Sequence, residues 1–356
     1  MTIPTQSTNI TAAWLGEVLG KHVTDVRAEN LGAGIGILGE VARLHVTYAT
    51  GEQGPPTYVS KCQSLASENV GISVAMGFYD REVNFYRNAS RQMPVRVPRC
   101  YHADMHDSSV PFVLILEDIV GSRCPNQIAG ISLDDAERII DTVSSVHARF
   151  WESDQLHSYT WLPPMNNPMY KGAQGMAVPK LAGYLERFGD RLTPATRSAV
   201  ETVIERYPDY LDWLASQGNA TLTHTDCRAE NYLFGGPDGD DAITMLDFQL
   251  CTKFNGMYDI ANLISGSLTP DARHQFEARL VERYHQNIAA LGVTGYSLDR
   301  CWRDYRACLL LQVFGTVVVS DLDGGNDSGN ELLAELLLRP ALSLNDHDVS
   351  DILASF

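Results

Sequence analysis

The stretch His224-Thr225-Asp226-Cys227-Arg228-Ala229-Glu230-Asn231 fits the pattern H-x-D-x-x-x-x-N and decides how the rest of the chain is interpreted. Asp247, in the sequence Leu246-Asp247-Phe248-Gln249, follows Asn231 by sixteen residues. Between them lie two apolar runs separated by a Gly- and Pro-rich turn, which predicts a β-hairpin. The hairpin would place Asn231 and Asp247 at the same end of two paired strands. Two such oxygen ligands, with a nearby carboxylate such as Asp226, are what phosphoryl transfer with Mg²⁺ requires.

A glycine-rich segment near the N-terminus, Gly34-Ile35-Gly36-Ile37-Leu38-Gly39-Glu40-Val41, fits G-x-G-x-x-G-x-V. Two different nucleotide folds use this spacing, so the pattern alone does not choose between them, and a plain glycine-rich turn fits equally well. A dinucleotide fold needs a helix after the glycines, whereas residues 43–48 alternate between polar and apolar as a half-buried strand does. A strand–loop–strand hairpin over phosphates is the kinase arrangement, in which glycines permit close approach of the main chain.

A lysine and a glutamate extend this pattern. Lys61 is the last residue of a short apolar strand predicted after the glycines, and Glu82 lies on a helix predicted at 74–89. A lysine in that place can neutralise phosphate oxygens, and a helix glutamate can hold it in position. Either residue alone is typical of a solvated surface, but their order relative to the two motifs favours a functional pair. Glu68 and Asp80 remain alternatives to Glu82.

The order of the predicted elements indicates an α+β fold of two lobes. Strand patterns predominate up to about residue 115, and helical patterns predominate from Ser132 onward, except for the β-rich segment at 221–249. This arrangement differs from the regular βαβ alternation of a doubly wound sheet. We therefore predict an N-lobe at 1–118 and a C-lobe at 119–356.

Composition and charge restrict the expected partners. The 356 residues include 27 Lys and Arg against 44 Asp and Glu, a formal net charge of −17. Such a surface repels nucleic-acid phosphates and anionic lipid, so neither nucleic acid nor membrane is expected to bind. The longest apolar run, 307–320, is shorter than the roughly 20 residues of a bilayer span and predicts a buried helix. Seven cysteines without a C-x-x-C pair, and no visible signal sequence, predict reduced thiols and a cytoplasmic location.

The motifs resemble those of the protein-kinase-like superfamily, in its small-molecule branch. The closer resemblance is to aminoglycoside phosphotransferases and to the related choline-kinase-like and ecdysteroid-kinase-like families, and it runs over nearly the whole chain. It is carried by His224-x-Asp226 with Asn231, Leu246-Asp247-Phe248-Gln249, Gly256-Met257-Tyr258-Asp259-Ile260-Ala261, the hinge-like strand Val113-Leu114-Ile115-Leu116-Glu117-Asp118, and Val146-His147-Ala148.

The resemblance implies a protein-kinase-like fold with an antiparallel-sheet N-lobe, a mainly helical C-lobe, and ATP and Mg²⁺ as cofactors. It implies that Asp226 and Arg228 are catalytic and that Asn231 and Asp247 bind the metal. The residues expected to bind the nucleotide are Gly34, Gly36, Gly39, Lys61, Glu82 and Glu117.

Departures from the protein-kinase pattern bear on the substrate. Thr225 stands where protein kinases carry the arginine that pairs with a phosphorylated activation loop, and Gln249 replaces the glycine of D-F-G. No A-P-E motif follows, and a helix is predicted from about Tyr258, which leaves no room for a long peptide-docking loop. A protein substrate is therefore not expected.

The leading hypothesis is an ATP-dependent phosphotransferase that places a small-molecule hydroxyl against Asp226. The alternative is a nucleotide-binding pseudokinase or regulatory module of the same fold, although all the catalytic-element residues are present. A metal-dependent hydrolase built on His224 and Asp226 explains neither the glycine hairpin nor Lys61. The acceptor (aminoglycoside, choline-like, steroid-like or another alcohol) and the choice between ATP and GTP stay open.

Overall fold

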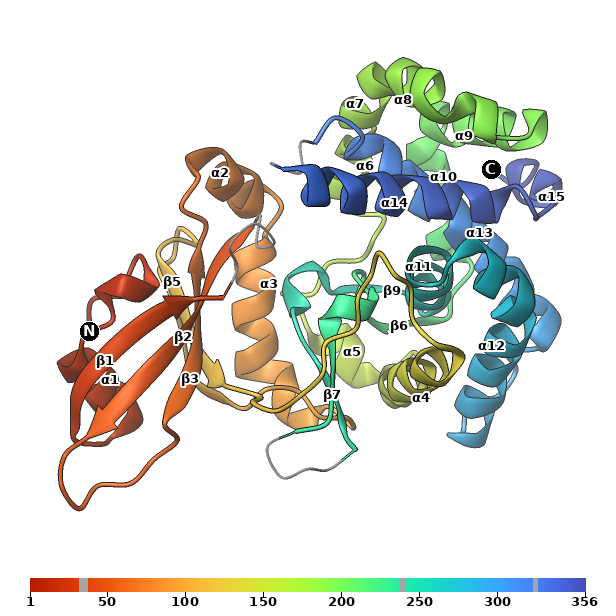
Figure 1. Ribbon diagram of the computed structural model, residues 1–356. Helices are drawn as coiled ribbons and strands as arrows, with labels where there is room; N and C mark the ends of the chain where they lie inside the picture. The colour runs from red at the N-terminus through yellow and green to blue at the C-terminus, as the bar shows by residue number, and fades with distance from the viewer. Residues whose placement is uncertain (32–37, 237–240, 323–325) are drawn as a thin grey trace. The chain divides into compact units, whose positions relative to one another are not determined.

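The computed structural model describes residues 1–31, 38–236, 241–322 and 326–356 (Figure 1). The chain forms two compact units, one made of residues 1–123 and 233–250 and the other of residues 124–232 and 251–356. A five-stranded sheet and a mainly helical remainder confirm the predicted α+β class.

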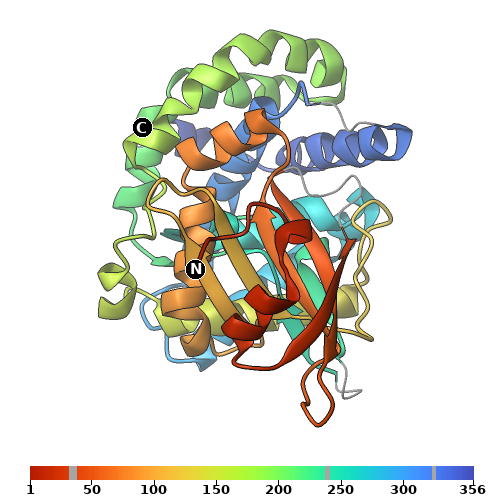
Figure 2. The ribbon, with the colours of Figure 1, turned by 90° about the vertical axis from the view of Figure 1, so that its left-hand side faces the viewer.

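The first unit is built on an antiparallel sheet with the strand order β1–β2–β3–β5–β4. The predicted alternation is present in β2, where Leu44 and Val46 are buried. Both pack in a core with Leu15 of the helix α1, which lies on this face of the sheet (Figure 2). The elements are η1 (Ser7–Asn9), α1 (Ala12–Leu19), β1 (Val23–Asn30), β2 (Gly39–Tyr48), β3 (Thr57–Gln63), β4 (Cys100–Met105) and β5 (Phe112–Glu117).

The helix predicted at 74–89 is interrupted. Gly77, with φ of 66°, adopts the left-handed conformation that glycine takes at little steric cost. It lies between the end of α2 and the start of α3, where it is the residue that precedes α3. The resulting elements are α2 (Ser67–Ala75), α3 (Phe78–Asn84), the π turn η2 (Phe85–Ala89) and the 3-10 turn η3 (Ser90–Gln92). Tyr79 of α3 packs against Phe112 of β5, with ring centroids 4.5 Å apart, so α3 covers part of the sheet.

The predicted hairpin is confirmed. β7 (Tyr232–Phe234) and β8 (Ile243–Met245) form a two-stranded sheet, and the turn η7 (Phe248–Leu250) follows. From Leu233 to Leu250 the hairpin belongs to the first unit. Phe248 stacks on Phe85 with ring centroids 3.6 Å apart, and this contact fixes the end of the hairpin to the turn after α3.

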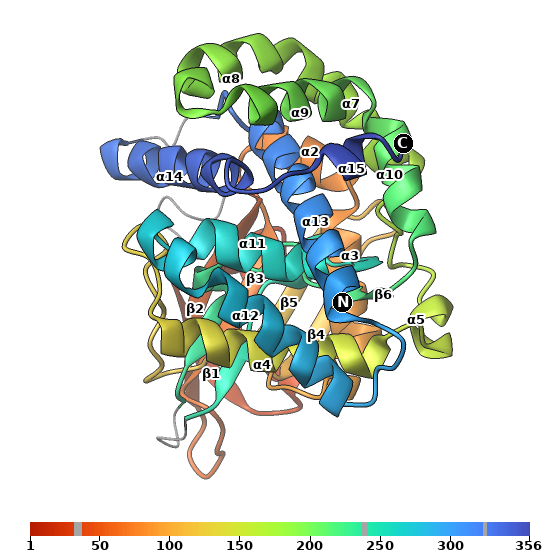
Figure 3. The ribbon, with the colours of Figure 1, turned by 90° about the vertical axis from the view of Figure 1, so that its right-hand side faces the viewer.

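The second unit is mainly helical. Its buried helix α11 (Met257–Ser267) packs against α4 (Leu133–Phe150), α12 (Pro270–Ala290), α13 (Leu298–Val318) and α14 (Asp327–Leu344) (Figure 3). β6 (Ala220–Thr223) pairs antiparallel with β9 (Thr252–Asn255). The other elements are α5 (Asp154–Ser158), α6 (Pro168–Gly172), α7 (Gln174–Ala177), η4 (Val178–Lys180), α8 (Leu181–Phe188), η5 (Gly189–Arg191), α9 (Pro194–Glu205), α10 (Tyr207–Ser216), η6 (Ala229–Asn231) and α15 (Ser350–Leu353).

The apolar run at 307–320 lies mostly on α13 and is largely buried within the second unit, as predicted. In the described ranges, no helix combines the length and the apolar character that a bilayer span needs.

Candidate active site

Lys61 lies in the middle strand of the sheet, and its ammonium group is shared by two carboxylates. β3 pairs with β2 and β5, and Lys61 stands opposite Val41 and Leu114. Its Nζ atom is 2.9 Å from Oε1 of Glu82 and 3.0 Å from Oδ1 of Asp247. Lys61 and Glu82 are both buried.

The two alternatives to Glu82 do not make this contact. Glu68 lies exposed in the first turn of α2, and Asp80 lies near the start of α3. Glu82 lies two residues further along α3 than Asp80, about half a helical turn away, so the two side chains leave the helix on different sides and only Glu82 reaches Lys61 of β3. The structure therefore pairs Lys61 with Glu82, and the binding of a nucleotide by this pair stays a prediction.

The charges of this group influence one another. Burial disfavours the charged form of Lys61, but the charges of Asp247 and Glu82 outweigh burial, so the pKa of Lys61 is raised. Burial raises the pKa of Glu82, and the positive charge of Lys61 opposes that shift. We expect Lys61 to be charged at neutral pH, because two carboxylates surround its ammonium group.

The last glycine of the glycine-rich motif lies against Lys61. A Cβ atom on Gly39 would be 3.2 Å from the carbonyl oxygen of Cys62 and 3.3 Å from Cε of Lys61, so a side chain there would crowd the lysine. Tyr79 of α3 donates to the carbonyl oxygen of Leu38 at 2.8 Å and fixes the start of β2. The predicted residues Gly34 and Gly36 lie outside the described residues.

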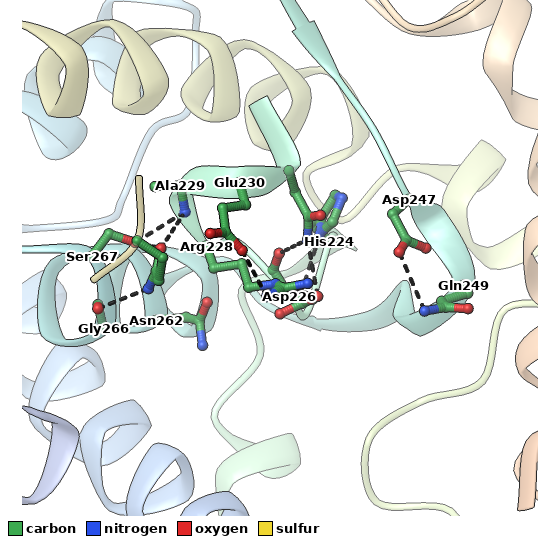
Figure 4. A network of polar contacts seen from close by, with 12 residues as sticks. His224, Asp226, Arg228, Ala229, Glu230, Asp247, Gln249, Asn262, Gly266 and Ser267 are labelled. Carbon is green, nitrogen blue, oxygen red and sulfur yellow. Dashed lines mark hydrogen bonds and ion pairs between the residues drawn. The ribbon is translucent and has the colours of Figure 1, made fainter. Parts of the chain in front are cut away.

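Asp247 has an unusual main-chain conformation. Its φ is 60°, a left-handed value that non-glycine residues seldom adopt and that is enriched at functional sites. One carboxylate oxygen faces Lys61, and the other accepts a hydrogen bond from Gln249 at 3.3 Å (Figure 4). Packing of the next residue, Phe248, on Phe85 holds the chain in this position.

Glu117 ends β5, and its carboxylate is occupied by neighbours within the first unit. One oxygen is 3.2 Å from Nη2 of Arg96, and the other accepts a hydrogen bond from the main-chain N–H of Arg99 at 3.1 Å. A nucleotide contact at Glu117 would therefore come from the main chain and not from this carboxylate.

Asp226 lies in the loop between β6 and η6 of the second unit. Its carboxylate accepts hydrogen bonds from Nδ2 of Asn231 at 2.9 Å and from Nε of Arg228 at 3.3 Å. Arg228 also contacts Glu230 at 3.2 Å (Figure 4). The side chain of Asp226 keeps 24% of its surface exposed, so it can meet a ligand while its neighbours hold its orientation.

Asn231 is buried and faces Asp226 through its amide nitrogen. Nδ2 donates both to the carboxylate of Asp226 and to the carbonyl oxygen of Asp226, the latter at 2.7 Å. The amide oxygen of Asn231 therefore points away from the aspartate. That oxygen is the atom through which Asn231 could bind a cation.

Asp259, near the start of α11, holds the main chain of the loop that carries Asp226. It is not among the predicted site residues. Its carboxylate accepts hydrogen bonds from the main-chain N–H groups of His224 at 2.7 Å and of Thr225 at 2.8 Å. His147 contacts the same carboxylate at 3.1 Å and Tyr284 at 2.9 Å. The only sequence signal for Asp259 was the Gly256–Ala261 segment, which resembled the kinase-like families.

We expect Asp259→Ala to lower the free energy of unfolding by roughly 3 kcal/mol, because it leaves the buried N–H of His224 and the half-buried N–H of Thr225 without their acceptor. Urea unfolding followed by circular dichroism measures this change. Asp190→Ala is the matched control, since Asp190 is exposed in the same unit and should change stability by no more than about 0.5 kcal/mol. Equal stability of the two variants would show that Asp259 does not support the loop.

Gln127 is a second supporting residue that sequence reasoning missed. Its side-chain oxygen accepts hydrogen bonds from the N–H of Ala229 at 3.0 Å and from Ser267 at 3.1 Å, while its nitrogen donates to Gly266 at 2.8 Å. Ala229 of the loop also donates from its N–H to Oγ of Ser267 at the end of α11, at 3.0 Å (Figure 4). A lone glutamine between predicted elements carries no sequence signal for such a role.

The structure thus places the predicted residues in two groups, one in each unit. The residues that contact one another are Lys61, Glu82 and Asp247 in the first unit, and Asp226, Arg228 and Asn231 in the second.

Several solved structures resemble this chain over most of its length at low identity. A putative aminoglycoside phosphotransferase from Ralstonia eutropha JMP134 is 15% identical, with 94% of this chain and 97% of that chain covered at a TM-score of 0.53. Choline kinase from Cryptosporidium parvum Iowa II is 9% identical, with 93% of this chain and 92% of that chain covered at a TM-score of 0.55. A mutant aminoglycoside 2'-phosphotransferase-IIIa in complex with GDP is 14% identical, with 87% of this chain and 91% of that chain covered at a TM-score of 0.51. At these identities the likeness establishes the fold, which is kinase-like.

No curated protein matches the chain. The sequence model of the ecdysteroid kinase-like family matches residues 34–293, which is well over half of the chain. The matched range includes both groups of contacting residues described above, and family and fold together support a kinase-like function. The chain belongs to the ecdysteroid kinase-like family.

Proposed function

We propose that this protein transfers the γ-phosphoryl group of ATP to a hydroxyl group of a small molecule. The observation that carries the proposal is the buried Lys61, whose ammonium group is shared by Glu82 and Asp247. A lysine held this way is typical of a phosphate-binding site, because the glutamate fixes its position while its charge stays available.

The first unit would bind the nucleotide. Lys61 would contact phosphate oxygens. Gly39 would leave room for them beside the lysine, because a side chain at this position would begin only 3.3 Å from Cε of Lys61. Gly34 and Gly36, the other two glycines of the motif, are also proposed to contact the nucleotide. Adenine would lie against the main chain that follows Glu117, since the carboxylate of that residue is bound to Arg96.

The donor atoms of Asp247 and Asn231 fit Mg²⁺. Both residues offer hard oxygen ligands, a carboxylate and an amide oxygen, and Mg²⁺ is usually bound by one or two carboxylates together with phosphates and water. When bound, Mg²⁺ would neutralise charge on the phosphates during transfer. Asp247 would exchange part of its contact with Lys61 for the metal, while Asn231 would keep its amide nitrogen on Asp226.

Asp226 would act on the acceptor. Asn231 and Arg228 hold its carboxylate, and this orientation would place one oxygen to accept the proton of the acceptor hydroxyl. Arg228 would also carry positive charge near the transferred group. Catalysis of this kind depends on positioning and charge neutralisation more than on covalent chemistry.

We expect millimolar Mg-ATP to raise the melting temperature of the purified protein through linkage. Lys61→Ala should weaken Mg-ATP binding by about tenfold or more, because a hydrogen bond to a charged group contributes about 1.5–3 kcal/mol. Each variant is compared with its own unliganded melting temperature, since Lys61→Ala also leaves two carboxylates unpaired.

Lys21→Ala is the matched control for this assay, because Lys21 pairs with Glu52 in the same unit and is not a predicted site residue. The control should retain the full shift. No shift of the wild type at millimolar Mg-ATP would refute nucleotide binding.

The acceptor is to be found by a screen of hydroxylated compounds with ATP and Mg²⁺, with ADP release as the readout. Release that depends on one compound, with a phosphorylated product seen by mass spectrometry, would establish the transfer. Nucleotide binding without turnover on any compound would favour a pseudokinase.

A further inference from the structure

A groove of about 870 Å³ lies in the first unit, apart from the residues assigned above. It is bounded by the C-terminal end of α1, by the turns η2 and η3 that follow α3, and by the segment 97–103, which includes the start of β4. Its volume falls within the range of about 300–1,000 Å³ that is typical of small-molecule sites.

The charge of the groove is opposite to that of the protein. None of the thirteen lining residues is an aspartate or glutamate, although the chain has 44 of them and a net charge of −17. Three arginines, Arg87, Arg91 and Arg99, line the groove. His102 also lines it, but burial lowers the pKa of its imidazole, so the positive charge of the groove comes from the arginines. A concave surface of this composition attracts anions.

Two of these arginines are available to a ligand. Arg91 and Arg99 are exposed, and neither guanidinium forms an ion pair with a carboxylate among the described residues. Arg99 lies over the ring of Tyr101 at 4.8 Å, which restricts its orientation. Arg87 is paired with Asp104 at 3.0 Å and is therefore the weaker candidate.

The wall of the groove is partly buried and combines polar and apolar groups. Tyr86 is buried in the π turn η2, and π turns are frequent at functional sites. Cys100 is half-buried beside it; burial raises the pKa of its thiol, while the nearby charges of Arg91 and Arg87 act in the opposite direction. Val97 and Pro98 add an apolar surface on the same side.

We propose that this groove binds a small phosphate monoester, with Arg91 and Arg99 on the phosphate group and the remainder of the molecule against Val97, Pro98 and Tyr101. Arginine suits this role because its planar guanidinium group forms paired hydrogen bonds with phosphate oxygens. The site is distinct from the proposed ATP site and does not depend on the protein being an active kinase.

Protection from chemical modification tests the site without a mutation, with phenyl phosphate as the probe. Phenylglyoxal modifies exposed arginines, and mass spectrometry of peptides locates the modified residues. Millimolar phenyl phosphate should slow modification of Arg91 and Arg99 but not of Arg27, which is 66% exposed on β1 outside the groove. Equal modification of all three arginines with and without the probe would overturn the proposal.

Calorimetry of phenyl phosphate binding separates this groove from the lysine site. Arg91→Ala and Arg99→Ala should each weaken binding about tenfold, because each removes charge-assisted hydrogen bonds. Arg27→Ala and Lys21→Ala, both outside the groove, should bind as the wild type does. Loss of binding in Lys61→Ala with normal binding in both groove variants would place the phosphate at Lys61 and refute the groove site.

Discussion

Replacing Asp226 by asparagine is expected to lower kcat by about 10²–10⁴-fold and to leave Mg-ATP affinity nearly unchanged. Asparagine keeps the shape of the side chain, and its oxygen can still accept the hydrogen bond from Asn231. It cannot accept the proton of the acceptor hydroxyl. The loss should therefore appear in the chemical step, with the acceptor from the screen and with ADP release measured at saturating nucleotide.

Arg228→Ala provides the comparison for this variant. Arg228 contacts both Asp226 and Glu230, so its loss should disturb the order of the loop and the charge near the phosphate together. We expect both kcat and nucleotide affinity to fall in Arg228→Ala, in contrast to the selective effect in Asp226→Asn. Wild-type turnover of Asp226→Asn with an identified acceptor would refute the proposed mechanism.

The elements of the fold could largely be predicted because their signals are local. The alternation at 43–48 and the two apolar runs around the 235–239 turn each specify a strand pairing within a few residues. The helix predicted at 74–89 shows the limit of this reasoning. Its apolar spacing continues across Gly77, but the left-handed conformation of that glycine divides it into two helices.

The candidate site could be predicted only in part, because its contacts join distant parts of the chain. Lys61 and Asp247 are 186 positions apart, and their contact depends on the packing of Phe248 against Phe85. No pattern in the sequence predicts that packing. Asp259 and Gln127 act on main-chain N–H groups of the Asp226 loop, so their roles become visible only when the path of the main chain is known.

Replacing Asp247 by asparagine should weaken nucleotide binding at least about 100-fold in the presence of Mg²⁺. Even groups that only orient a metal ligand contribute about 10–100-fold to metal affinity, and Asp247 is proposed as a direct ligand. Asparagine is the suitable replacement because it tolerates the left-handed conformation seen at φ of 60°. Asp25→Asn, at an exposed position of β1, is the matched control and should bind as the wild type does.

The same variant should behave differently when the metal is removed by EDTA. In the proposed site without Mg²⁺, the carboxylate of Asp247 would repel the phosphates and would compete with them for Lys61, from which it is 3.0 Å away. Asp247→Asn should therefore bind metal-free ATP as tightly as the wild type, or more tightly. Calorimetry with and without Mg²⁺ measures both constants. A similar loss under both conditions would mean that Asp247 supports the nucleotide site through Lys61 and not as a ligand of the metal.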